Sequence, residues 1–166
     1  MVVAIGVIAV LGVAIHGQRS GGRQEVQLPW LGMTLKAGWQ VRFYDGCRFA
    51  VPLTWQVTPG SRQVFAPDGS SLLIWSRQVP SWSLHRSQAT AAFGPVSTVH
   101  ENDDRRLWIE AGDDIRIRHY IATVAGSVAC NGLLEIRASM KNPEETAQTI
   151  ADSIGAAPAE WPADLK

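Results

Sequence analysis

Residues 39–51 read Trp-Gln-Val-Arg-Phe-Tyr-Asp-Gly-Cys-Arg-Phe-Ala-Val, with every second side chain apolar on both sides of Asp45-Gly46. Such alternation places one row of side chains on each face of a strand, and Asp-Gly is a preferred two-residue hairpin turn. The stretch therefore predicts two antiparallel strands joined by a tight turn, and it indicates a domain built around antiparallel sheet.

The rest of the chain continues this pattern and adds two helices. A second hairpin is expected around Pro67-Asp68-Gly69, and the segment 81–93 has a Ser-rich start and stops at Gly94-Pro95, as a short helix does. Further strands are expected at 96–100, 105–110, 115–124 and 130–138. Long antiparallel meanders interrupted by two helices predict an α+β fold, with an antiparallel sheet flanked by helices.

The last helix has the clearest boundaries. Asn142 can cap it, Pro143 fits the first helical position, and Gly155 ends it. One apolar stripe would face the sheet: Ala147, Ile150, Ala151 and Ile154.

Two segments resemble PsbP-like domains, the family of the extrinsic photosystem subunit. They are Cys47-Arg-Phe-Ala-Val-Pro-Leu-Thr-Trp55, similar to the family's opening strand, and Ile121-Ala-Thr-Val-Ala-Gly-Ser-Val-Ala-Cys130 with the helix that follows. The similarity extends in element order over residues 39–155. It implies an α/β/α sandwich and a non-catalytic extrinsic subunit, assembly factor or binding module, and no metal or catalytic motif carries over with it.

Composition narrows the function classes. The 166 residues are 46% hydrophobic and 18% charged, which suits one domain with a packed core and excludes global disorder. Fifteen basic and fifteen acidic residues leave no net charge, so a general attraction to nucleic acid is not expected.

The N-terminus carries a membrane-anchor signal. Residues 2–15 contain no polar side chain, but as a helix they would span only about 21 Å of a roughly 30 Å hydrocarbon core. Residues 1–16 are therefore interpreted as an anchor or an uncleaved signal, with the domain on the periplasmic, extracytoplasmic side. Arg19 and Arg23 favour the cytoplasmic side instead.

The chain is divided accordingly into four parts. They are the anchor 1–16, a polar linker 17–32, the PsbP-like domain 33–155 and a flexible tail 156–166.

Few residues form a recognisable chemical motif. His16, His85, His100 and His119 lack metal-ligand spacing, and neither a phosphate loop nor a nucleophile elbow is found. We therefore expect no catalytic residues, cofactor or metal. The only two cysteines, Cys47 and Cys130, predict a disulfide in an exported domain, and two buried thiols are the alternative.

The remaining signal is interaction surface. Tryptophan and arginine are enriched where proteins bind each other. The candidate partner-binding residues are Trp30, Leu31, Trp82, Trp108, Arg116, Arg118 and Trp161. The function expected is an accessory subunit on a membrane-protein complex, with a photosynthetic reaction-centre or light-harvesting complex implied by the resemblance. The alternatives are an envelope-tethered ligand-binding or assembly factor that acts transiently, and a hydrolase with an unrecognised site.

Overall fold

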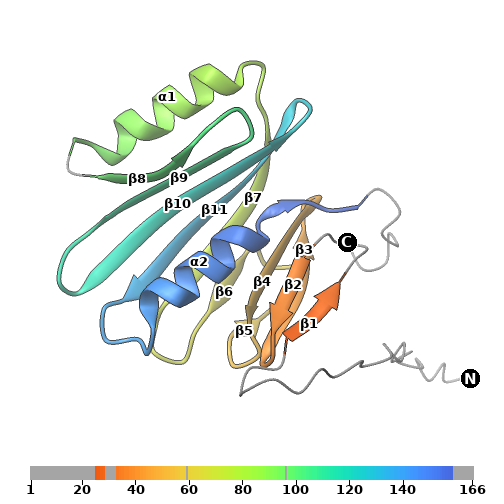
Figure 1. The fold of residues 1–166 in the computed structure, drawn as a ribbon, viewed down its shortest axis with the longest axis vertical. Coiled ribbons are helices and arrows are strands. Elements are labelled where there is room, and N and C mark those ends of the chain that lie inside the picture. Colours follow the sequence, from red (N-terminus) through yellow and green to blue (C-terminus); the bar gives the residue numbers. More distant parts are fainter. Residues whose placement is uncertain (1–24, 29–32, 59, 96, 159–166) are drawn as a thin grey trace, which may run out of the picture.

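The computed structural model describes residues 25–28, 33–58, 60–95 and 97–158 (Figure 1). The elements in chain order are β1 (Glu25–Leu28), β2 (Met33–Lys36), β3 (Trp39–Tyr44), β4 (Cys47–Pro52), β5 (Gln56–Val57), β6 (Gln63–Phe65), β7 (Ser71–Gln78), α1 (Trp82–Phe93), β8 (Thr98–Asn102), β9 (Arg106–Gly112), β10 (Arg116–Ala125), β11 (Val128–Arg137), α2 (Pro143–Ser153) and β12 (Gly155–Ala156).

A seven-stranded antiparallel sheet forms the centre of the molecule, in the order β5-β6-β7-β11-β10-β9-β8. The ten-residue strands β10 and β11 pair along their whole length, from Arg116 opposite Arg137 to Ala125 opposite Val128. Two smaller sheets, β12-β4-β3 and β1-β2, complete the strand pairing.

The main core lies between one face of the large sheet, helix α2 and the sheet β12-β4-β3 (Figure 1). Leu72, Ile74, Leu134 and Ile136 project from the large sheet and are fully buried there. A disulfide between Cys47 on β4 and Cys130 on β11 joins the two sheets across this core. The predicted pairing of the two cysteines is confirmed.

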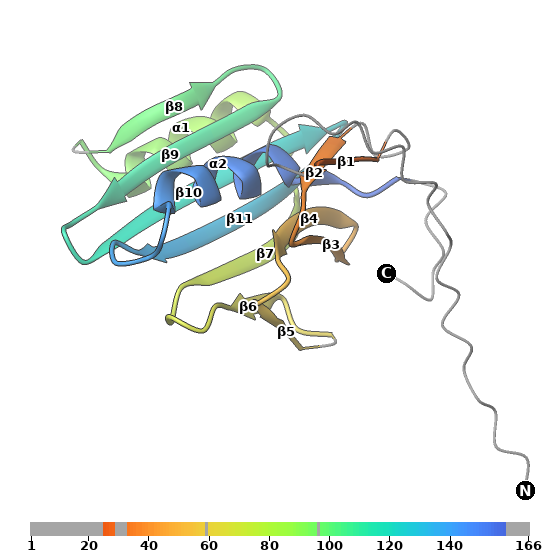
Figure 2. The ribbon, with the colours of Figure 1, turned by 60° about the horizontal axis from the view of Figure 1, so that its bottom comes forward.

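The opposite face of the large sheet is covered by α1, which Figure 2 shows on the other side of the sheet from α2. This smaller core contains Leu107, Ile109, Tyr120 and Ala122, packed against Trp75 and three α1 residues, Trp82, Ala89 and Phe93. The Ser81 hydroxyl caps α1 by accepting from the Leu84 backbone N–H at 3.3 Å. The architecture is therefore α+β with antiparallel sheet and a helix on each face, as the alternating pattern predicts.

Three local features differ from the expectations. Residues 25–28 lie in the expected linker but form β1, paired with β2. The turn before α2 holds Asn142 in the left-handed region, with φ 57°, and its side chain bonds Glu145 rather than capping the backbone. Gly155 ends the helix by starting the short strand β12 beside β4. The expected anchor 1–16 lies outside the described residues, and no described helix has the length and apolarity to cross a bilayer.

Candidate functional site

Two histidines and one glutamate meet on the α2 side of the large sheet, near its β8 edge. The His100 Nε2 lies 2.7 Å from Glu110 Oε2, and the His119 Nδ1 lies 3.7 Å from the same oxygen. One potential ligand atom from each of the three side chains lies within 4.8 Å of the others. The cluster runs from solvent into the protein, since the His100, Glu110 and His119 side chains are 32%, 34% and 4% exposed.

Trp108 forms the inner wall of this cluster. Its ring stacks on His100, with centroids 4.2 Å apart, and its Nε1–H donates to the His119 Nδ1 at 3.3 Å. Burial lowers the pKa of His119 to about 4, although the nearby Glu110 carboxylate acts to raise it. At neutral pH the His119 imidazole is therefore neutral, and it presents a lone pair toward Trp108 and Glu110.

The sheet register explains how distant residues meet here. His119 on β10 is directly opposite Glu110 on β9, and β8 lies on the other side of β9. A β-bulge at His100 inserts one residue between two consecutive pairs. A search for metal-ligand spacing along the sequence does not find this cluster, because each of its three residues comes from a different strand. The turns at 103–105 and 113–115 predict two successive hairpins, and strand pairing in these hairpins is the signal that could have brought the three residues together.

A second polar network is buried beneath α1. The Tyr120 hydroxyl donates to Asn131 Oδ1 at 2.7 Å and lies 2.9 Å from His85 Nε2, and the Asn131 amide donates to the Trp75 carbonyl. Burial lowers the pKa of His85 and raises the pKa of Tyr120, so both groups are held neutral. A cavity of about 240 Å³ opens beside His85 and Tyr120 and is also lined by Arg77 and Phe93.

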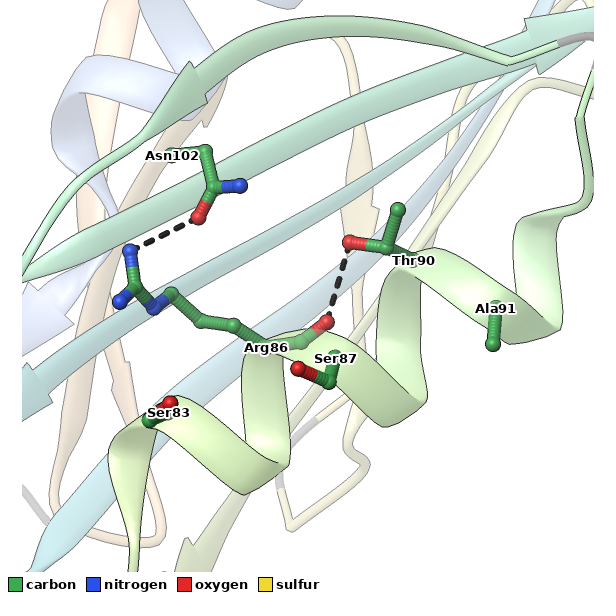
Figure 3. Close-up of a pocket in the computed structure, with 6 residues that line it drawn as sticks. All are labelled: Ser83, Arg86, Ser87, Thr90, Ala91 and Asn102. Carbon is green, nitrogen blue, oxygen red and sulfur yellow. Dashed lines mark hydrogen bonds between the residues drawn. The ribbon is translucent and has the colours of Figure 1, made fainter.

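A shallow groove of about 470 Å³ runs between α1 and β8 (Figure 3). Arg86 crosses it and donates to Asn102 Oδ1 at 2.8 Å, while the Thr90 hydroxyl donates to the Arg86 carbonyl. Its small polar lining includes Ser83 and Ser87. The Arg86 Nη1 and the Thr90 hydroxyl are therefore engaged within the groove, while the buried Arg86 Nε has no hydrogen-bond partner among the described residues.

The predicted partner-binding residues differ in how exposed the structure leaves them. Trp108 is only 5% exposed, so the expectation of a surface anchor is wrong: it faces the same side of the sheet as the main core. Trp82 is half-buried at the first position of α1, where its Nε1–H donates to the Asp103 carbonyl. Arg116 and Arg118 are exposed on β10. The remaining three, Trp30, Leu31 and Trp161, lie outside the described residues.

Both arginines belong to a part of the α1-side sheet face that α1 leaves exposed. The cross-strand row Arg118–Glu135–Ser71–Phe65 shows that these side chains share this face. Phe65 is 47% exposed, and Arg116 lies 3.8 Å from Glu135. We call the surface formed by Phe65, Arg116, Arg118 and Glu135 the arginine face.

Comparison with known proteins gives similarity of fold alone. No family model and no curated protein matches the chain. Its structure is similar to that of a protein from Bacteroides thetaiotaomicron VPI-5482, with a TM-score of 0.45, 12% identity and 69% of this chain covered. The chain spans 46% of that protein.

The structure is also similar to cyanobacterial PsbP from Synechocystis sp. PCC 6803. The TM-score is 0.43 and the identity 15%, with 86% of this chain and 99% of that chain covered. The expected PsbP-like resemblance is confirmed at this weak level, and it concerns the fold.

Proposed function

We propose that this chain is a non-catalytic accessory domain that docks on a membrane-protein complex through the arginine face. The observation that carries the proposal is that Arg116, Arg118 and Phe65 share an exposed face of a rigid, paired sheet. Sheet side chains are held in fixed relative positions by the backbone ladder, so they lose little freedom when a partner binds.

The chemistry of this face specifies its partner. Arginine offers a planar fork of donors that matches carboxylates, and an exposed aromatic ring beside it adds apolar contact area. Glu135, which is 3.8 Å from Arg116 and opposite Arg118, and Asp113, which interacts electrostatically with both arginines, offset part of their charge, but the Arg116 side chain is 52% exposed and can bind a further carboxylate. The matching partner surface is therefore acidic with an apolar centre.

The compartment in this proposal is extracytoplasmic. A disulfide buried between two sheets, with Cys47 and Cys130 0% and 2% exposed, is typical of proteins that fold in an oxidising environment. The apolar run 2–15 would hold the domain near the membrane, and tethering raises the effective concentration of a weak docking surface. The sequence resemblance to PsbP-like domains makes a photosynthetic complex the first partner to test.

The test is migration of the full chain in native membranes solubilised with mild detergent. We expect the 18.1 kDa chain to migrate with a large complex, and the double variant Arg116→Glu, Arg118→Glu to migrate alone. The matched control replaces two exposed arginines elsewhere, Arg42 and Arg105, by glutamate and should comigrate like the native chain.

Migration of the native chain alone would overturn the stable-subunit proposal and favour the transient assembly factor. Loss of comigration in both double variants would show that total charge, rather than the arginine face, governs binding. The hydrolase alternative required histidines and acids to converge in a concave pocket. His100, His119 and Glu110 do converge, but neither described cavity is lined by them.

A further inference from the structure

We propose that His100, Glu110 and His119 form a binding site for one divalent transition-metal ion, with Zn²⁺ as its first occupant. This site lies on the opposite face of the large sheet from the arginine face, and it is independent of the docking function proposed above. Two imidazoles and one carboxylate are a donor set that borderline metals such as zinc favour, and that hard ions such as Ca²⁺ do not.

The distances are close to those a bound ion needs. In a tetrahedral site, ligand atoms at about 2.1 Å from one zinc ion lie about 3.4 Å from each other. The two contacts to Glu110 Oε2, at 2.7 and 3.7 Å, lie on either side of that separation, and the cluster as a whole spans at most 4.8 Å. Binding in that geometry therefore requires the widest pair to approach by up to about 1.4 Å.

The side chain best able to make that movement is His100. It lies on the edge strand β8 at a β-bulge, where pairing is locally interrupted, and its side chain is about one-third exposed. Glu110 and His119 instead sit on paired inner strands, directly opposite each other. The site therefore combines two fixed ligands with one adjustable ligand that faces solvent.

Trp108 orients the buried ligand and would report on binding. Its indole N–H bonds the His119 Nδ1, the atom that faces Glu110, so an incoming ion would displace this hydrogen bond. Three protein ligands leave at least one coordination position for water. Because His100 is the ligand nearest to solvent, that open position lies on the solvent side of the cluster. Ion binding should therefore change the hydrogen bonding of the Trp108 ring and with it the fluorescence of this residue.

The experiment measures binding of Zn²⁺ alone to the full chain, prepared without a histidine tag and in a buffer that does not chelate metals. Isothermal titration and elemental analysis after gel filtration should both give one zinc per chain. Replacing a residue that only hydrogen-bonds a metal ligand typically lowers metal affinity 10- to 100-fold, and replacing a ligand itself should lower it further. We therefore expect Glu110→Gln and His100→Ala each to weaken binding by at least about tenfold.

The matched control is Glu135→Gln. Glu135 is on the neighbouring strand β11, its side chain is 36% exposed against 34% for Glu110, and it lies on the other face of the sheet. This variant should bind zinc like the native chain. The double variant Arg116→Glu, Arg118→Glu should also bind normally, so failure of docking and failure of the metal site are distinguishable.

A spectroscopic readout separates the site from adventitious surface binding. Paramagnetic Cu²⁺ at the cluster should quench the Trp108 part of the fluorescence. In Trp108→Phe the Cu²⁺-dependent quenching should be largely lost while zinc binding persists at one ion per chain. Absence of zinc binding to the folded native chain, or equal binding in the native chain, Glu110→Gln and His100→Ala, would overturn the proposal.

Discussion

Opening the disulfide between Cys47 and Cys130 is expected to cost the fold about 4.5 kcal/mol. The two cysteines are 83 positions apart, so the bond closes a large loop in the unfolded chain. In the loop-entropy description, the stabilisation at 25 °C grows with the logarithm of the loop length and reaches about 4.5 kcal/mol for a loop of this size. The perturbation is the double variant Cys47→Ala, Cys130→Ala.

The packing of the sulfur atoms adds to this cost. Both cysteines are buried in the main core between β4 and β11, and alanine would leave small voids there. The native chain, unfolded and refolded in the presence of a reductant, retains both sulfur atoms and lacks only the bond. The difference between the reduced native chain and the double variant therefore measures packing, and the difference between oxidised and reduced native chain measures the cross-link.

The assay is urea unfolding followed by circular dichroism and tryptophan fluorescence. The oxidised chain should unfold at a higher urea concentration, and the dependence on urea should steepen once the cross-link is removed, because the unfolded chain then exposes more surface. A loss below about 1 kcal/mol between oxidised and reduced native chain would refute the loop-closure reasoning. If the double variant does not fold, the reduced native chain still gives the value.

Three further substitutions test separate parts of the structure. Gly132→Ala on β11 should destabilise the fold by about 1–3 kcal/mol in thermal unfolding, because its Cβ would lie 2.5 Å from Ile154 Cδ1 in the core; an unchanged melting temperature would contradict this packing. Ser153→Ala should cost about 1–3 kcal/mol in urea, because the Ser153 hydroxyl accepts the buried Ala50 N–H at 2.7 Å; Ser153→Thr, which keeps the hydroxyl, is the comparison. Burial lowers the pKa of His85 below its ordinary 6.5, so the unfolded state binds more protons and stability should fall as pH drops below about 6.5. His85→Gln should make the pH dependence of the free energy of unfolding shallower, and an identical slope would argue against a buried neutral His85.

The hairpins were predictable because their information is local. Asp45-Gly46 lies between two alternating runs, and the structure places both in positive φ, at 52° and 72°, in the turn between β3 and β4. The hairpin of β6 and β7 follows in the same way from Gly69, whose φ is 85°. Strand β12 was not predictable, since its two residues gain their partner only when the C-terminal end of α2 reaches β4.

The candidate site was hidden because it depends on register across three strands. The sequence from 96 to 124 predicts the strands that carry these residues. It contains no signal for the β-bulge that turns His100 toward Glu110. The same limit explains Trp108. Alternation shows that it points away from Leu107 and Ile109, but not which sheet face is more deeply buried, and both faces here carry a core.

The disulfide also determines how the domain would carry a mechanical load. A pull on the chain before β3 passes along β3 to Cys47 at the start of β4, and from there it can cross directly to Cys130 at the middle of the large sheet. The segment between the two cysteines, which contains β4 after Cys47, β5 through β10 and α1, is bypassed by that path. A load applied across the chain from before β3 to after α2 would therefore stretch β3, the part of β11 after Cys130, and α2, while the His100–Glu110–His119 cluster stays shielded from tension.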